Sequence, residues 1–134
     1  MNLRGLKMLE LRIQRHNESA GKIARFLHRQ DKIDTVNYPR LPDHPGHAIA
    51  SRQMDGFGGL LSFALKGGFH HVRELLSLLH QAHNAARLGS VSTLVGPPMA
   101  PSHVELNAAE REAMGIPESL GRYSTGIENT EDLI

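Results

Sequence analysis

Apolar residues recur at helical spacing along residues 3–30, so that they fall on one face of a helix. Charged residues, among them Arg12, Lys22 and Arg29, occupy most of the other positions, and no proline interrupts the segment. The pattern predicts one long amphipathic helix over 3–30. Its apolar stripe consists of Leu6, Leu9, Ile13, Ala20, Ile23, Ala24 and Leu27.

Shorter runs of aliphatic and β-branched residues predict strands. Pro39 follows the first run, Gly67 the second and Pro97 the third. Because proline cannot donate to a ladder and glycine favours turns, these residues are expected to end the strands. The predicted strands cover 33–38, 60–65, 91–95 and 120–127.

Helical signals lie between the predicted strands. Asp43 is a candidate N-cap for a short helix over 45–53, with Pro45 in its first turn. Apolar residues return to helical spacing over 69–82. We therefore expect a helix on each side of the second strand.

Two capping signals stand near the end of the sequence. Asn107 and Glu110 have the spacing of a capping box and predict a short helix that Gly115 ends. Asn129 is a second N-cap, followed by acids that favour a helix N-terminus. Because a lone helical turn is unstable, we expect this last element to be a helix cut short at Ile134.

Helices and strands thus alternate along the whole chain. This order predicts an α/β fold, more specifically a small α+β domain, in which helices cover a sheet of three or four mostly antiparallel strands. The length of 134 residues is enough for one core, so we expect a single domain over 1–134.

Composition excludes several classes of protein. The 15 Lys and Arg are scattered among 14 acids and give a net charge of +1, so no nucleic-acid partner is expected. No apolar run approaches the roughly 18 residues that would span a membrane. The sequence has no cysteine, which fits a cytoplasmic protein and excludes disulfides and thiolate chemistry.

The common catalytic and metal-binding motifs are also missing. The nine histidines include the pairs His44/His47 and His80/His83 and the doublet His70-His71, but no H-E-x-x-H or comparable zinc pattern is present, so we expect no metal. The glycines of 56–59 precede a strand rather than open a helix, and this argues for a turn rather than a phosphate site. No G-x-S-x-G sequence supports a hydrolase.

Arg122 lies in the middle of the last predicted strand, where arginine is rarely buried unless it is paired. Its planar guanidinium suits bidentate binding of a carboxylate. By pattern alone, an exposed or salt-bridged arginine remains the alternative.

Several segments together resemble the C-terminal part of the Cys/Met-metabolism PLP-dependent enzymes, such as cystathionine γ-synthase, cystathionine γ- and β-lyases, methionine γ-lyase and O-acyl-homoserine sulfhydrylases. The similar segments run through nearly the whole chain, in order and with near-family spacing. They are "RGLK" at 4–7 with His16-Asn17, "YPGLPSHPQH" at 38–47, "RQMSGFGGMLSFELKGG" at 52–68, "SLGGVETL" at 87–94, "HPASMTH" at Pro98 and Ser102-His103, and "IRLSVGIEDVEDLI" at 121–134.

The resemblance implies the smaller, C-terminal domain of a fold type I enzyme, over 1–134, preceded by an interdomain helix at about 3–30. A large domain, absent here, would bind pyridoxal 5′-phosphate (PLP). The family reaction is a trans-sulfuration-type β/γ-elimination or γ-replacement, by a carbon–sulfur lyase or γ-synthase. Its substrates are sulfur amino acids or homoserine esters, and its enzymes are homotetramers. We expect this fragment to be inactive alone. A non-catalytic module that pairs with, or regulates, a separate PLP-domain chain is the alternative.

Three substrate-binding residues follow from the resemblance. Arg122 matches the arginine that binds the substrate α-carboxylate, which agrees with its strand position and its chemistry. Arg87 and Leu88 match a segment that borders the substrate site and partly uses backbone contacts. Arg87 replaces the family's serine, and Ser92 replaces its glutamate. These departures leave the particular reaction open.

The resemblance also yields a prediction about the cofactor. None of the four lysines matches the PLP lysine of the family, which lies upstream of this segment; they are Lys7, Lys22, Lys32 and Lys66. Because a lysine amine must form the Schiff base, the chain mixed with PLP is expected to show no Schiff-base absorbance. A lysine–PLP adduct formed in stoichiometric yield on borohydride reduction would contradict this.

Overall fold

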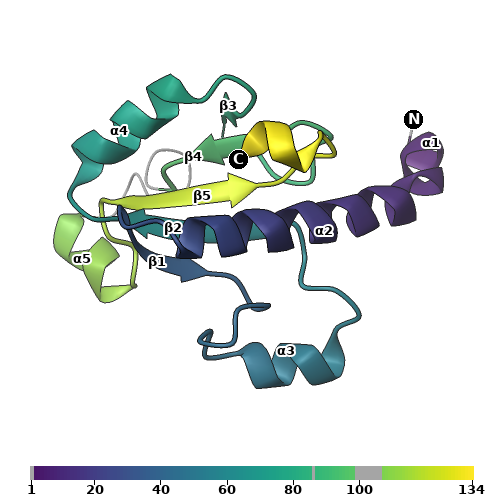
Figure 1. The fold of residues 1–134 in the computed structure, drawn as a ribbon, viewed down its shortest axis with the longest axis horizontal. Coiled ribbons are helices and arrows are strands. Elements are labelled where there is room, and N and C mark those ends of the chain that lie inside the picture. Colours follow the sequence, from purple (N-terminus) through teal and green to yellow (C-terminus); the bar gives the residue numbers. More distant parts are fainter. Residues whose placement is uncertain (1, 86, 99–106) are drawn as a thin grey trace.

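The structure, a computed structural model, describes residues 2–85, 87–98 and 107–134. Within these residues, five strands form one sheet in the order β1-β2-β5-β4-β3 (Figure 1). Neighbouring strands are antiparallel except β3 and β4, which are parallel. The predicted class is confirmed, although the sequence predicts fewer strands. The strands are β1 Ile33–Asn37, β2 Leu60–Leu65, β3 His83–Asn84, β4 Leu94–Gly96 and β5 Leu120–Ser124.

Helices cover this sheet and flank it. Figure 1 shows α2 running along the sheet, while α1 and the first turns of α2 extend past the strands. The chain ends in a 3-10 turn, η1, beside α2. The bounds are α1 Asn2–Lys7, α2 Leu9–His28, α3 His47–Gln53, α4 Phe69–Leu78, α5 Ala108–Ala113 and η1 Thr130–Leu133.

The predicted helix over 3–30 is two helices. Met8 separates them with φ −103° and ψ 2°, and neither glycine nor proline marks this break in the sequence. Farther along the apolar stripe, Ala20, Ile23 and Ala24 are buried against the sheet. Leu6 remains 60% exposed because the helix there lies beyond the sheet. The apolar stripe therefore has a partner only along part of its length.

One face of the sheet carries the hydrophobic core. Alternation along the strands directs Leu61, Phe63 and Tyr123 to this face, where they pack with residues of α2 and with Val95. In β1 the register shifts between Ile33 and Thr35, which lets Ile33 and Val36 both pack against the core. The opposite face of the sheet does not carry this core, and Arg122 lies on it.

The strands predicted over 33–38 and 60–65 are confirmed almost to the residue, but the two later strands are shorter than predicted. The run at 91–95 forms a strand only from Leu94, because the backbone groups of Val91 and Thr93 bond to other segments. The last strand ends at Ser124; Thr125 N still donates to Gly59 O at 2.9 Å, and the chain turns after it.

Two more boundaries depend on tertiary contacts. The helix predicted over 69–82 ends at Leu78, and Leu79 packs against the core in an extended conformation. Strand β3 is not predicted from the sequence, because two residues are too few to show alternation. It forms where His83 and Asn84 pair with Leu94 and Val95.

Two of the three N-caps predicted from the sequence are present in the structure. The capping box is confirmed: Asn107 N donates to Glu110 Oε2 at 2.8 Å, and Glu110 N to Asn107 Oδ1 at 3.0 Å. Asn129 caps η1 by accepting from Glu131 N at 3.4 Å. The prediction for Asp43 is wrong, because α3 begins at His47, two residues after the predicted start, and Gly46 occupies its N-cap without a side-chain bond.

Packing in the core makes a prediction for Gly121. A Cβ there would lie 2.8 Å from the ring of Phe63 on β2. Gly121→Ala is expected to lower the free energy of unfolding by about 1–3 kcal/mol through overpacking, measured by urea denaturation. The matched control is Gly5→Ala, where a Cβ meets nothing within 4 Å and alanine favours the helix. Equal effects of the two substitutions would contradict this account.

Candidate functional site

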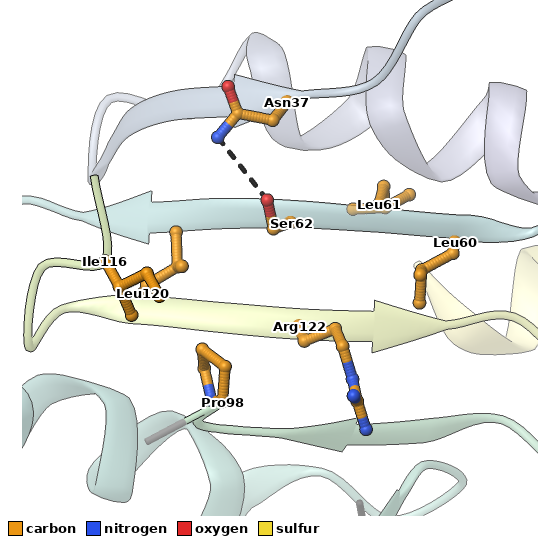
Figure 2. Close-up of a pocket in the computed structure, with 8 residues that line it drawn as sticks. All are labelled: Asn37, Leu60, Leu61, Ser62, Pro98, Ile116, Leu120 and Arg122. Carbon is orange, nitrogen blue, oxygen red and sulfur yellow. Dashed lines mark hydrogen bonds between the residues drawn. The ribbon is translucent and has the colours of Figure 1, made fainter. Parts of the chain in front are cut away.

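A row of polar side chains crosses the face of the sheet opposite the core. Arg122 on β5 pairs with Ser62 on β2 and with Gly96 on β4, and Ser62 in turn pairs with Asn37 on β1. Residues paired in register share a face, so the three side chains lie side by side. Asn37 Nδ2 donates to Ser62 Oγ at 3.4 Å (Figure 2).

Arg122 lines a cavity of about 280 Å³ on this face. The residue is half-buried, and its guanidinium lies toward the β4 side in Figure 2. The other lining residues are mainly apolar, so the charged group of Arg122 borders an apolar surface. A cation beside such a surface can bind the carboxylate of a small amphipathic molecule. The lining residues are Asn37, Leu60, Leu61, Ser62, Pro98, Ile116, Leu120 and Arg122.

The structure brings two of the three predicted site residues together. Arg122 Nη2 donates to the backbone oxygen of Arg87 at 3.5 Å, a long hydrogen bond. The contact uses the main chain of Arg87, whose side chain is exposed. Leu88 is 64% exposed and does not line the cavity. Arg122 therefore lines the cavity, and the 87–93 loop, which we call the rim, meets Arg122 through the main chain of Arg87. Leu88 belongs to this loop but not to the lining.

The loop formed by residues 87–93 is hydrogen-bonded to the segment that follows β5. Glu128 accepts two hydrogen bonds from Thr93. Thr93 N donates to Glu128 Oε1 at 2.6 Å, and Thr93 Oγ1 donates to Glu128 Oε2 at 2.8 Å. We call this pair of bonds the Glu128 clamp. Gly126 N donates to Thr93 Oγ1 at 2.9 Å, and Ile127 N to Val91 O at 2.9 Å. The site rim thus depends on residues after Arg122 in the chain.

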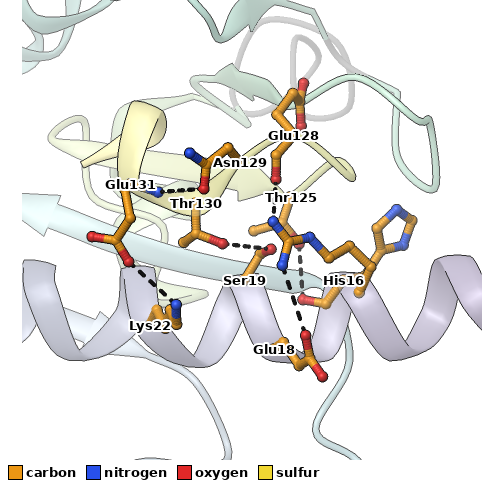
Figure 3. Close-up of polar contacts among 10 residues, drawn as sticks. His16, Glu18, Ser19, Lys22, Thr125, Glu128, Asn129, Thr130 and Glu131 are labelled. Carbon is orange, nitrogen blue, oxygen red and sulfur yellow. Dashed lines mark hydrogen bonds and ion pairs between the residues drawn. The ribbon is translucent and has the colours of Figure 1, made fainter.

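Helix α2 in turn holds the segment after β5 (Figure 3). Arg15 Nη2 donates to Glu128 O at 2.8 Å, and Ser19 Oγ lies 3.0 Å from Thr130 Oγ1 in a buried hydrogen bond. Lys22 Nζ forms an exposed ion pair with Glu131 at 3.2 Å. These contacts could not be predicted from the sequence, because they join positions more than 100 residues apart in the chain.

His16 is buried beside the same segment. Its backbone oxygen accepts from Thr125 Oγ1 at 3.3 Å, and its Nε2 is buried without a hydrogen-bond partner among the described residues. Burial lowers the pKa of His16 below its usual 6.5, and the nearby positive charge of Arg12 lowers it further. The backbone of Ser90 and the charge of Glu128 oppose this shift of the pKa.

Asn37 and Ser62 were not predicted as site residues. Both residues lie in strands whose bounds the sequence predicted. The sequence did not give the register of these strands, which aligns the two residues with Arg122. The predicted match at Ser102-His103 lies outside the described residues.

No metal centre or membrane span is found in the part of the chain that the structure describes. Its His, Asp and Glu residues form no group of three that could hold a metal ion. Its helices include none with the length and apolarity needed to cross a membrane.

Fold and site define a small α/β domain with a cavity on one face of its sheet that Arg122 lines. The family model described as Cys/Met metabolism PLP-dependent enzyme matches residues 1–134. The chain belongs to this family.

Relatives and solved structures agree with this assignment. L-methionine gamma-lyase of Fusobacterium nucleatum subsp. polymorphum is 45% identical over 132 residues, or 98% of this chain and 33% of that protein. Cystathionine gamma-synthase of Mycobacterium leprae (strain TN) is 40% identical over all of this chain and 34% of its own length. The crystal structure of cystathionine gamma synthase from Xanthomonas oryzae pv. oryzae in complex with cystathionine superposes with a TM-score of 0.92 at 42% identity, covering 98% of this chain and 34% of that one. The chain thus spans about a third of the length of these relatives.

The family depends on PLP, and we asked whether the described residues fit that cofactor. No lysine lines the Arg122 cavity. Lys32 and Lys66 line a different cavity beside α4, and Lys22 pairs with Glu131. The described residues therefore do not supply a Schiff-base amine next to Arg122.

The lowered pKa of His16 predicts how stability depends on pH. Below pH 6.5 the unfolded chain binds a proton at this position that the folded chain does not, so the free energy of unfolding falls from pH 6.5 down to the lower folded-state pKa. His16→Gln is expected to reduce this loss between pH 7 and 5 in urea titrations. The exposed His80→Gln serves as the control. A His16→Gln variant with the wild-type pH dependence would contradict the assignment.

Proposed function

We propose that this chain is the C-terminal, substrate-binding domain of a PLP-dependent trans-sulfuration enzyme and that Arg122 holds the α-carboxylate of its substrate. The observation that carries the proposal is the position of Arg122, a half-buried residue that lines an otherwise mainly apolar cavity. A guanidinium there offers parallel N–H donors to a carboxylate, while apolar walls accommodate an aliphatic or thioether chain. The structure-related synthase was solved with cystathionine, an amino acid of this chemistry.

The rim residues have supporting roles in this proposal. The backbone oxygen of Arg87 accepts from the guanidinium of Arg122 and so restricts its orientation. The exposed side chain of Arg87 adds a second positive charge on this loop, which attracts anionic groups. In this proposal Leu88 contacts the substrate either through its backbone, or through its side chain once a partner domain covers the exposed 87–93 loop.

The parent reaction in this proposal is β/γ-elimination or γ-replacement on a sulfur amino acid or a homoserine ester. PLP supplies the electron sink in such chemistry, and we assign no step at the cofactor to this chain. The cofactor lysine would come from a large domain, and the complete enzyme would be a homotetramer in the cytoplasm. This domain alone would then be inactive.

An exposed apolar arm supports the alternative in which a separate chain supplies the PLP domain. Several apolar side chains of α1 and the start of α2 are exposed in this chain, and apolar patches of this kind mark interaction sites. They are Leu6, Met8, Leu9, Leu11 and Ile13. Co-purification with a PLP-binding chain, with recovery of lyase or synthase activity, would favour this module.

The role of Arg122 can be tested by NMR titration of the chain with L-methionine. We expect the Arg122 Nε–H signal, assigned by its loss in Arg122→Lys, to shift with L-methionine but not with L-methioninol, which lacks the carboxylate. Arg122→Ala should weaken binding about 10–100-fold, since hydrogen bonds to charged groups contribute about 1.5–3 kcal/mol.

The matched control for this titration is Arg73→Lys, an exposed substitution on α4 away from the cavity. It should bind like wild type. Equal shifts with both ligands, or binding unaffected by Arg122→Ala, would overturn the proposed carboxylate site.

A further inference from the structure

The Glu128 clamp joins the two chain segments that frame the guanidinium of Arg122. One segment is β5 with its continuation to Glu128, and the other is the 87–93 loop leading into β4. The loop contributes the Arg87 oxygen that accepts from Arg122. At the far end of the loop, β4 places Gly96 in register with Arg122.

The clamp is built into a close-packed part of the structure. Thr93 is completely buried, and both of its donors point to the carboxylate of Glu128. A Cβ at Gly126 would meet the Glu128 carboxylate and Val91 O, and would lie 2.6 Å from Thr93 N. Only glycine therefore lets the two segments approach this closely. Hydrogen bonds to an ionised carboxylate are among the stronger ones in proteins.

We infer that Glu128 is a positioning residue for Arg122, because its clamp on Thr93 fixes the loop whose backbone orients the guanidinium. Glu128 does not line the cavity and would not touch a ligand there. It acts through Thr93 and the loop backbone, while Arg15 on α2 holds the Glu128 backbone in place. The link to carboxylate binding rests on the proposed function; the positioning of Arg122 does not.

The inference is tested first on the chain without ligand. Glu128→Ala is expected to raise amide hydrogen exchange over 90–93 at least about tenfold and to increase the mobility of the Arg122 side chain in ¹⁵N relaxation. Thr93→Val removes the Oγ1 bond to Glu128 and also the acceptor for Gly126 N at nearly constant shape, but retains the bond from Thr93 N to Glu128, and it should raise exchange and mobility in the same direction. Glu128→Gln retains an acceptor for Thr93 N and should restore most of the order.

Ser19→Ala is the matched control, because it removes a buried hydrogen bond between α2 and η1 but does not touch the clamp. It should lower stability in urea without mobilising Arg122. If Glu128→Ala leaves Arg122 as rigid as in wild type, or if Ser19→Ala mobilises Arg122 equally, the inference is overturned.

Titration with L-methionine then separates this inference from the proposed function. If both are correct, Glu128→Ala weakens the binding that depends on Arg122, about tenfold, and Glu128→Gln largely restores it. If wild type shows no binding dependent on Arg122 while Glu128→Ala still mobilises its side chain, the proposed function fails and the positioning role stands. Binding that depends on Arg122 but is unchanged in Glu128→Ala overturns the positioning role alone.

Discussion

The central strand β5 is hydrogen-bonded on both sides, to β2 and to β4, and the rest of the structure depends on this double pairing. The pairing directs Tyr123 into the core and Arg122 to the opposite face. It aligns Arg122 with Ser62 on one side and Gly96 on the other. A shift of one residue in register would bury the guanidinium in the core and expose the aromatic ring. The apolar core therefore fixes where the candidate site lies.

The segment after β5 also fixes the position of the neighbouring 87–93 loop. Thr125 bonds to the oxygens of His16 and Gly59, and Glu128 bonds to Thr93. Helix α2, buried against the sheet through residues such as Ile23, thereby reaches the rim of the Arg122 cavity without contributing a residue to its lining. The α2 contacts that stabilise the domain thus also support the geometry of the site.

Much of the local structure was predictable from the sequence. Strands β1 and β2 and the capping box of Asn107 follow from patterns within a few residues, and these predictions are confirmed. The start of β4 at Leu94 and the end of α4 at Leu78 were not predictable. These boundaries depend on contacts with Glu128 and with the core, which are distant in the chain.

The sequence by itself determined the class of fold, the family resemblance and Arg122 as the candidate carboxylate-binding residue, because residue chemistry and short-range periodicity carry those signals. Only the tertiary structure decided that Ser62 lies between Arg122 and Asn37, that Arg87 meets Arg122 through the main chain, and that Glu128 holds the 87–93 loop. The physical reason is that strand register and hydrogen bonds between distant segments arise from packing of the whole chain, which no local pattern encodes.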